Sequence, residues 1–222
     1  MVSLRSYLAA GRVAACLLSL DAGVVLDAWF AAQKDLHSWS AEFTQTRALK
    51  TLTQPLTAAG RLWFEAPGDF RWELGRPAQT IALRDGPDLY VIYPALARAE
   101  HYSLGAAAPR EMRDTMSLLS AGFPRNRQEF ESQFRVLSVA QTNGLWRLAL
   151  EPKSKFARQM MPELRIGLAA HDLALASTEM VFVDGSSMRN DFTNAVVNPA
   201  LDTNLFHWRP PADYKVTEPL SK

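Results

Sequence analysis

Cysteine is almost absent from the chain, because Cys16 is the only one among 222 residues. A disulfide framework and a cysteine-based metal site are therefore excluded for everything beyond the N-terminal region. A basic excess is missing too, since 24 Lys and Arg stand against 23 Asp and Glu, for a formal net charge of +1. Nucleic-acid-binding domains usually carry such an excess, so we expect no nucleic-acid partner.

Motifs for catalysis are also missing. The chain contains no nucleophile elbow, no zinc-protease helix motif, no Walker loop and no dinucleotide-binding glycine motif. The histidines stand singly, at His37, His101, His171 and His207. Three carboxylates, Glu65, Asp69 and Glu73, flank one turn, where a solvated strand face explains them better than acid–base chemistry. We therefore predict a protein that is not an enzyme, with no catalytic residue, no metal site and no cofactor.

The N-terminal region has features of an export signal. Arg5 and Arg12 precede an apolar run over residues 13–20, which is far too short to span a bilayer. We predict an export leader over residues 1–22. Two alternatives remain open: an N-terminus that is not cleaved, and lipidation of Cys16 through a lipobox-like stretch. For the carrier itself we predict no stable membrane insertion.

From residue 39 onward, apolar and polar residues alternate with the period of two that is typical of half-buried strands. The pattern predicts strands at 39–44, 56–65, 70–74, 81–84, 89–93, 134–140, 145–151, 164–168, 175–183 and 188–197, and an extended segment at 207–216. Hairpin signals such as Asn143-Gly144 and Asp184-Gly185 separate them. The fold class is thus α+β, mainly β: a single antiparallel sheet of about ten or eleven strands, which curls because of its size.

Helical spacing of apolar residues appears in three places, residues 24–36, 110–121 and 126–131. The middle segment carries Met112, Met116 and Leu119 on one side, and we expect it to cover the concave face of the sheet. Methionine suits a surface that adapts to ligands of changing shape. Two interpretations of this apolar face stay open: a filled core, and a cavity for a ligand.

Several motifs along the chain match those of a known family. They are Phe43-Thr44-Gln45, the run 60–64 with sequence GRLWF, Pro67 followed by 70–73 with sequence FRWE, the set Asp85-Gly86, Leu89-Tyr90 and Tyr93-Pro94, and the tail 206–211 with sequence FHWRPP. In this order and spacing the chain resembles the LolA family of periplasmic outer-membrane lipoprotein carriers. The resemblance runs over residues 27–216. It implies one carrier domain, which we place at residues 23–217, with a tail at 218–222.

The resemblance implies an unclosed β-barrel with a helical lid and a hydrophobic cavity for the acyl chains of lipoproteins. The cavity residues it implies are Phe43, Leu62, Phe64, Phe70, Trp72, Ile81, Leu83, Leu89, Val91, Met112, Met116 and Leu119. It further implies a periplasmic monomer that takes an acylated lipoprotein from an inner-membrane ABC transporter and passes it to an outer-membrane acceptor.

The chain departs from the family at one position. Many members carry a basic residue before the turn proline, where it helps to latch the lid, and this chain has Ala66 there. Arg71 and Arg76 are candidate replacements. Alternative functions are a carrier of another lipid or glycolipid, an outer-membrane acceptor, an envelope-stress sensor of the same fold, and a purely structural envelope module.

Overall fold

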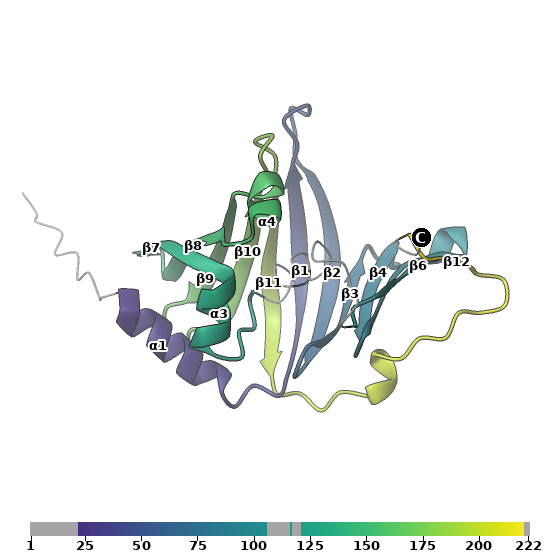
Figure 1. Cartoon of the computed structure of the whole chain (residues 1–222), viewed down its shortest axis with the longest axis horizontal. Coiled ribbons are helices and arrows are strands. Elements are labelled where there is room, and N and C mark those ends of the chain that lie inside the picture. The colour runs from purple at the N-terminus through teal and green to yellow at the C-terminus, as the bar shows by residue number, and fades with distance from the viewer. Residues whose placement is uncertain (1–21, 106–115, 117–120, 220–222) are drawn as a thin grey trace, which may run out of the picture.

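The computed structural model describes residues 22–105, 116 and 121–219 of the chain (Figure 1). Its helices are α1 (Ala22–Gln33), α3 (Arg127–Gln133) and α4 (Lys155–Met160), with short 3₁₀ turns η1 (Pro94–Leu96) and η2 (Thr203–Leu205). Its strands are β1 (Ser38–Ala48), β2 (Leu56–Glu65), β3 (Asp69–Leu74), β4 (Thr80–Asp85), β5 (Asp88–Tyr93), β6 (Arg98–Ser103), β7 (Phe134–Thr142), β8 (Leu145–Pro152), β9 (Glu163–Ala169), β10 (Leu175–Val181), β11 (Ser187–Val197) and β12 (Lys215–Thr217).

The described strands form one 12-stranded sheet in the order β12-β6-β5-β4-β3-β2-β1-β11-β10-β9-β8-β7. Neighbours are antiparallel, except that β12 pairs in parallel with β6. The sheet curves but does not close, because β7 and β12 remain at its two edges (Figure 1). This confirms the predicted mainly β architecture, an unclosed curved sheet.

The hairpin turns follow the sequence signals. Asn143 and Gly144 both adopt positive φ, as a tight turn between β7 and β8 requires, and Gly185 does so between β10 and β11. Neither β6 nor α4 was predicted. Because β6 was missed, the sheet has one strand more than the eleven that were expected at most. The extended segment at 207–216 pairs with the sheet only at its end, through β12.

Two helices cover one end of the concave face. α1 and α3 lie together beside β7 (Figure 1), and the Trp29 ring packs edge-to-face on Phe130 with centroids 5.5 Å apart. Asn126 caps α3 by accepting a hydrogen bond from the backbone N–H of Glu129. The main core joins these helices to the inward residues of the sheet, among them Trp146, Leu148 and Leu150.

Some predictions fall on residues outside the described part of the chain. The export leader, apart from Ala22, and most of the predicted helix at 110–121 are among them, including Met112 and Leu119. Met116 is described and is buried, with 7% of its surface exposed.

Candidate ligand cavity

The register of three neighbouring strands decides which side chains face inward. Phe64 lies opposite Phe70 and Leu62 opposite Trp72 across β2 and β3, and Trp72 lies opposite Ala82 across β3 and β4. Since paired residues share a face of the sheet, all of these side chains project into the concave side. Four of the predicted cavity residues are thus brought together.

A hollow of about 180 Å³ opens between the two halves of the sheet. It is mostly apolar and is lined by Gln45, Leu62, Phe64, Gly68, Phe70, Trp72, Ala82, Arg84, Met116, Gly122, Phe123, Leu164, Leu175, Thr178, Met180, Met188, Asn190 and Phe192. Five predicted residues, Leu62, Phe64, Phe70, Trp72 and Met116, are therefore among its walls. The opposite wall comes from β9, β10 and β11, which had not been assigned to the cavity.

The residues on that opposite wall carry a signal that sequence reasoning passed over. Met180 and Met188 lie opposite one another across β10 and β11, and Phe192 follows on the same face. Phe123, after the predicted covering helix, stacks on Phe64 with centroids 4.4 Å apart. The alternation within residues 175–197 would have identified the strand residues, but not Phe123.

A row of polar side chains crosses the cavity wall on three adjacent strands. Gln45 Nε2 donates to Asn190 Oδ1 at 3.1 Å, and Asn190 Nδ2 donates to Thr178 Oγ1 at 3.2 Å. Gln45 and Asn190 are both buried. Their mutual hydrogen bonds offset the cost of placing amides in an apolar wall, which is otherwise about 1–3 kcal/mol for each unsatisfied group.

Phe43 belongs to the core beneath the cavity and is absent from its lining. Its ring contacts Trp72 with centroids 4.5 Å apart and Phe192 at 6.1 Å, and the side chain is 2% exposed. Leu89 and Val91 share the concave face, because they lie opposite Arg84 and Ala82, but they are not among the lining residues either.

Ile81 and Leu83 lie on the opposite face of the sheet, which corrects their predicted position in the cavity. They form a separate cluster with Ile92 and Ala99, against which Tyr90, Trp208 and Tyr214 pack. The physical reason is that β4 is apolar on both faces, so alternation alone does not show which face is inside. The pairing of Trp72 with Ala82 assigns the inward face to the small residue.

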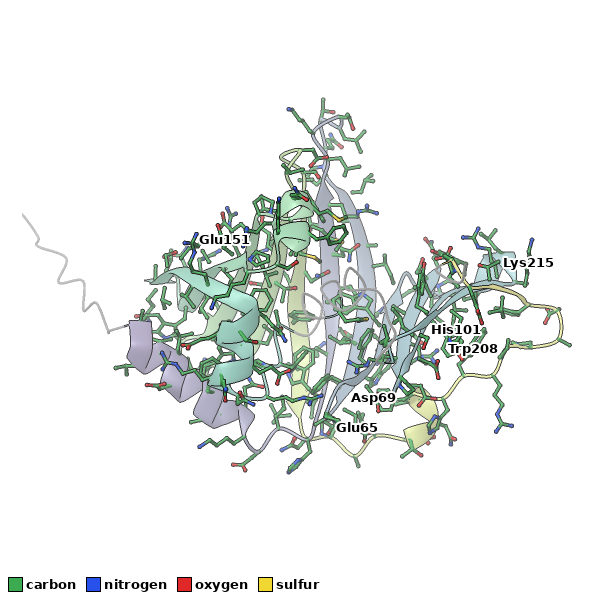
Figure 2. The ribbon with its side chains drawn as sticks, viewed as in Figure 1. Glu65, Asp69, His101, Glu151, Trp208 and Lys215 are labelled. Carbon is green, nitrogen blue, oxygen red and sulfur yellow. The ribbon has the colours of Figure 1, made fainter. Side chains whose placement is uncertain are left out.

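The C-terminal segment covers this outer cluster. The Trp208 ring packs on Tyr90 with centroids 5.3 Å apart, and Tyr90 stacks on His101 at 4.8 Å. Figure 2 shows Trp208 beside His101 at this edge of the sheet. Around it, His101 Nε2 lies 2.7 Å from Asp88 Oδ1, and His207 Nδ1 lies 2.8 Å from Asp85 Oδ2.

A second hollow of about 200 Å³ adjoins the first at the β2–β3 turn. Phe64, Gly68, Arg84, Met116 and Phe123 line both hollows. Displacement of the Phe123 and Arg84 side chains would therefore join the two into one larger space. Asp69, at the start of β3, marks this end of the sheet in Figure 2.

The two candidate latch residues lie away from this rim. Arg71 pairs with Glu73 at 2.7 Å, on the outer face of β3. Arg76 pairs with Glu42 at 2.6 Å. The β2–β3 turn is instead held by Arg125, whose Nε and Nη2 donate to the carbonyl oxygen of Pro67 at 3.1 and 2.9 Å.

Among the described residues, no helix is long and apolar enough to cross a membrane. Within the same residues, no group of three or more His, Cys, Asp or Glu side chains is arranged to hold a metal ion.

Comparison with known proteins agrees with this architecture. The family model described as outer membrane lipoprotein carrier protein LolA matches residues 34–209. The outer-membrane lipoprotein carrier protein of Bordetella avium is 25% identical over 189 residues, which cover 82% of each chain. That of Neisseria meningitidis serogroup B is 27% identical over 209 residues, or 94% of each chain.

A solved structure shares the fold. An uncharacterised conserved protein from Thermus thermophilus matches with a TM-score of 0.52 at 9% identity, over 90% of this chain and 99% of that one. The family model covers most of the chain, including β1 to β11 and the start of the C-terminal segment. The chain therefore belongs to the LolA family of outer membrane lipoprotein carrier proteins.

Proposed function

We propose that this protein is a non-catalytic periplasmic carrier, which holds the acyl chains of lipoproteins in the concave cavity and moves them from the inner to the outer membrane. The observation that carries the proposal is the apolar hollow between two walls of an unclosed sheet, lined by aromatic and methionine side chains. Family membership supplies the class of cargo, an acylated lipoprotein.

The hollow is small beside known ligand pockets, which measure about 300–1,000 Å³. It offers about 180 Å³. We therefore expect it to widen when it is loaded. Met116, Met180 and Met188 line it, and unbranched methionine side chains repack at low cost. Movement of Phe123 away from Phe64 would add the second hollow.

The energetics favour a cavity that is not fully enclosed. Burial of one methylene contributes about 0.8 kcal/mol, so a sixteen-carbon chain contributes on the order of 12 kcal/mol. Three such chains would exceed the limit of about 18–21 kcal/mol that non-covalent complexes reach. A carrier must release its cargo, so part of this free energy has to be offset by the cost of opening the cavity.

The donor and the acceptor are proposed from the family alone. We propose an inner-membrane ABC transporter as donor and an outer-membrane acceptor protein as recipient. The acyl chains of the client contact the apolar walls of the cavity. The outer face of the sheet is covered by the C-terminal segment, so we expect no acyl chain to bind there.

A charge placed in the cavity wall tests the proposal. Phe70 lines the hollow, so Phe70→Glu should abolish extraction of a triacylated lipopeptide from phospholipid vesicles, because burial of an unpaired carboxylate is costly. Val183→Glu is the matched control, since Val183 is 71% exposed and is not among the lining residues. Urea denaturation checks that both variants are folded under the conditions of the extraction assay, because Phe70 also packs against the main core. Extraction by Phe70→Glu at the wild-type level would refute the assigned cavity.

A further inference from the structure

The rim of the cavity holds a cation that the acyl-chain role does not use. Arg84 lies opposite Phe70 across β3 and β4, so its side chain projects into the concave side. It lines both hollows at the place where they meet. Its Nε donates to the carbonyl oxygen of Gly86 at 3.1 Å, which fixes the direction of the guanidinium.

Apart from this hydrogen bond, the guanidinium of Arg84 has no carboxylate partner among the described residues. Among the described residues, no carboxylate oxygen lies within the 4.0 Å of an ion pair with Arg84. Asp69 attracts it from farther away, but Asp69 Oδ1 already accepts from the backbone N–H of Gly86 at 2.8 Å. Among the described residues that line the second hollow, Glu129 is the one carboxylate. Burial lowers the pKa of Arg84 below its ordinary value, and the nearby charge of Arg125 adds to this.

The surroundings keep the guanidinium in place and leave its outer donors available. An arginine side chain has five N–H donors, and one of them is used by Gly86. A Cβ added at Gly68 would lie 2.9 Å from Arg84 Nη1, so any side chain there would push the guanidinium aside. Phe70 and Trp72 continue from this point into the apolar wall.

We propose that Arg84, with Arg125 beside it, forms a headgroup subsite for an anionic acyl lipid, whose carboxylate or phosphate binds the guanidinium while its chain enters the cavity. The planar fork of arginine matches both groups in a two-point contact. This inference rests on the proposed acyl cavity. It extends the ligands beyond lipoproteins, because ester- and amide-linked acyl groups have no charge at their linkage.

Competition between lipids of equal chain length tests the subsite. Palmitic acid and hexadecanol each displace an apolar fluorescent probe from the full-length protein, and the wild type should bind the acid at least about ten-fold more tightly, the effect of a hydrogen bond to a charged group. Arg84→Gln should bring the two lipids to equal affinity without weakening hexadecanol. Arg84→Lys should restore part of the preference. Arg61→Gln is the control and should leave the preference unchanged, because Arg61 is an exposed residue on β2 that pairs with Glu42.

The source of the anion is resolved by a second pair of lipids. Lysophosphatidic acid compared with monopalmitoylglycerol reports recognition of a phosphate headgroup, and inorganic phosphate alone reports recognition of a free anion. Displacement by inorganic phosphate at the affinity of the lipid would overturn a lipid subsite. Equal binding of acid and alcohol by the wild type, or a preference that survives in Arg84→Gln, would overturn the role of Arg84. Failure of every lipid to displace the probe would instead overturn the acyl cavity itself.

Discussion

Arg125 and Pro67 connect the two sides of the cavity rim through a double hydrogen bond. Both Nε and Nη2 of the guanidinium donate to the same carbonyl oxygen, at 3.1 and 2.9 Å. Pro67 lies in the turn between β2 and β3, and Arg125 follows the segment 110–121 that the sequence predicts to cover the concave face. Ala66 stands just before the turn proline, where the resemblance to many family members implies a basic residue. In this chain a cation reaches the turn from the opposite side.

Loss of this double hydrogen bond should make the rim open more often. Arg125→Gln keeps a polar side chain but loses the two-point contact, so the rate of uptake of an apolar fluorescent probe should rise about five-fold. Stopped-flow fluorescence measures the rate. Arg135→Gln is the matched control, because Arg135 pairs with Glu151 on β7 and β8, away from the rim. Equal uptake rates for both variants and the wild type would show that Arg125 does not restrain the rim.

Gly60 and Phe43 form a second close relationship, under the cavity floor. A Cβ at Gly60 would lie 2.2 Å from Phe43 Cζ and 2.5 Å from the carbonyl oxygen of Glu73. Gly60→Ala should therefore lower the free energy of unfolding by about 1–3 kcal/mol, the usual cost of overpacking a core. Gly105→Ala, whose nearest contact is Ser103 Oγ at 3.7 Å, is the control. Urea denaturation that finds no difference between the two variants would contradict this packing.

Two histidines attach the C-terminal segment to the sheet. Burial disfavours the charge on His101, but hydrogen bonds to Asp88 and Glu218 outweigh it and raise its pKa above 6.5. The hydrogen bond to Asp85 raises the pKa of His207 above the same ordinary value. A raised pKa in the folded state means that the stabilisation is complete below 6.5 and is lost as the pH rises through the folded value.

The attachment should therefore weaken with rising pH. Amide hydrogen exchange over residues 206–219, corrected for its intrinsic pH dependence, should be several-fold faster at about pH 8.5 than at about pH 5.5. The variant His101→Gln/His207→Gln should lose this dependence. His171→Gln should retain it, since His171 pairs with its neighbour Asp172 in the turn between β9 and β10. Protection that is independent of pH in the wild type would contradict the role of these two histidines.

The strands were predictable from sequence because their alternation is local. β2, β3, β5 and β8 lie where the period of two and the turn residues place them. β6 was missed because residues 98–103, with sequence RAEHYS, show almost no alternation of apolar and polar residues. They form a strand because they pair with the neighbouring strand β5.

The cavity residues were predictable only in part, because the pairing of strands decides which side chains face the concave side and which of them lie close together. Phe70 and Trp72 were identified from a single strand, whereas Ile81 and Leu83 show the same pattern and face outward. Local alternation shows which side chains of β10 and β11 share a face, but their position opposite β2 and β3 depends on contacts across about 100 residues of sequence, which no local pattern encodes. The position of Arg125 at the rim could not be predicted for the same reason, because it depends on a hydrogen bond to Pro67 in a turn far away in the sequence.

The central claim is that acyl chains occupy the concave side of the sheet, and adjacent residues of β3 test it most directly. Phe70 lines the cavity, and Arg71 projects from the other face of the same strand. A photo-reactive amino acid at position 70 should cross-link to the acyl chains of a bound lipoprotein, and the same amino acid at position 71 should not. Cross-linking of the acyl chains at position 71 but not at position 70 would contradict the account.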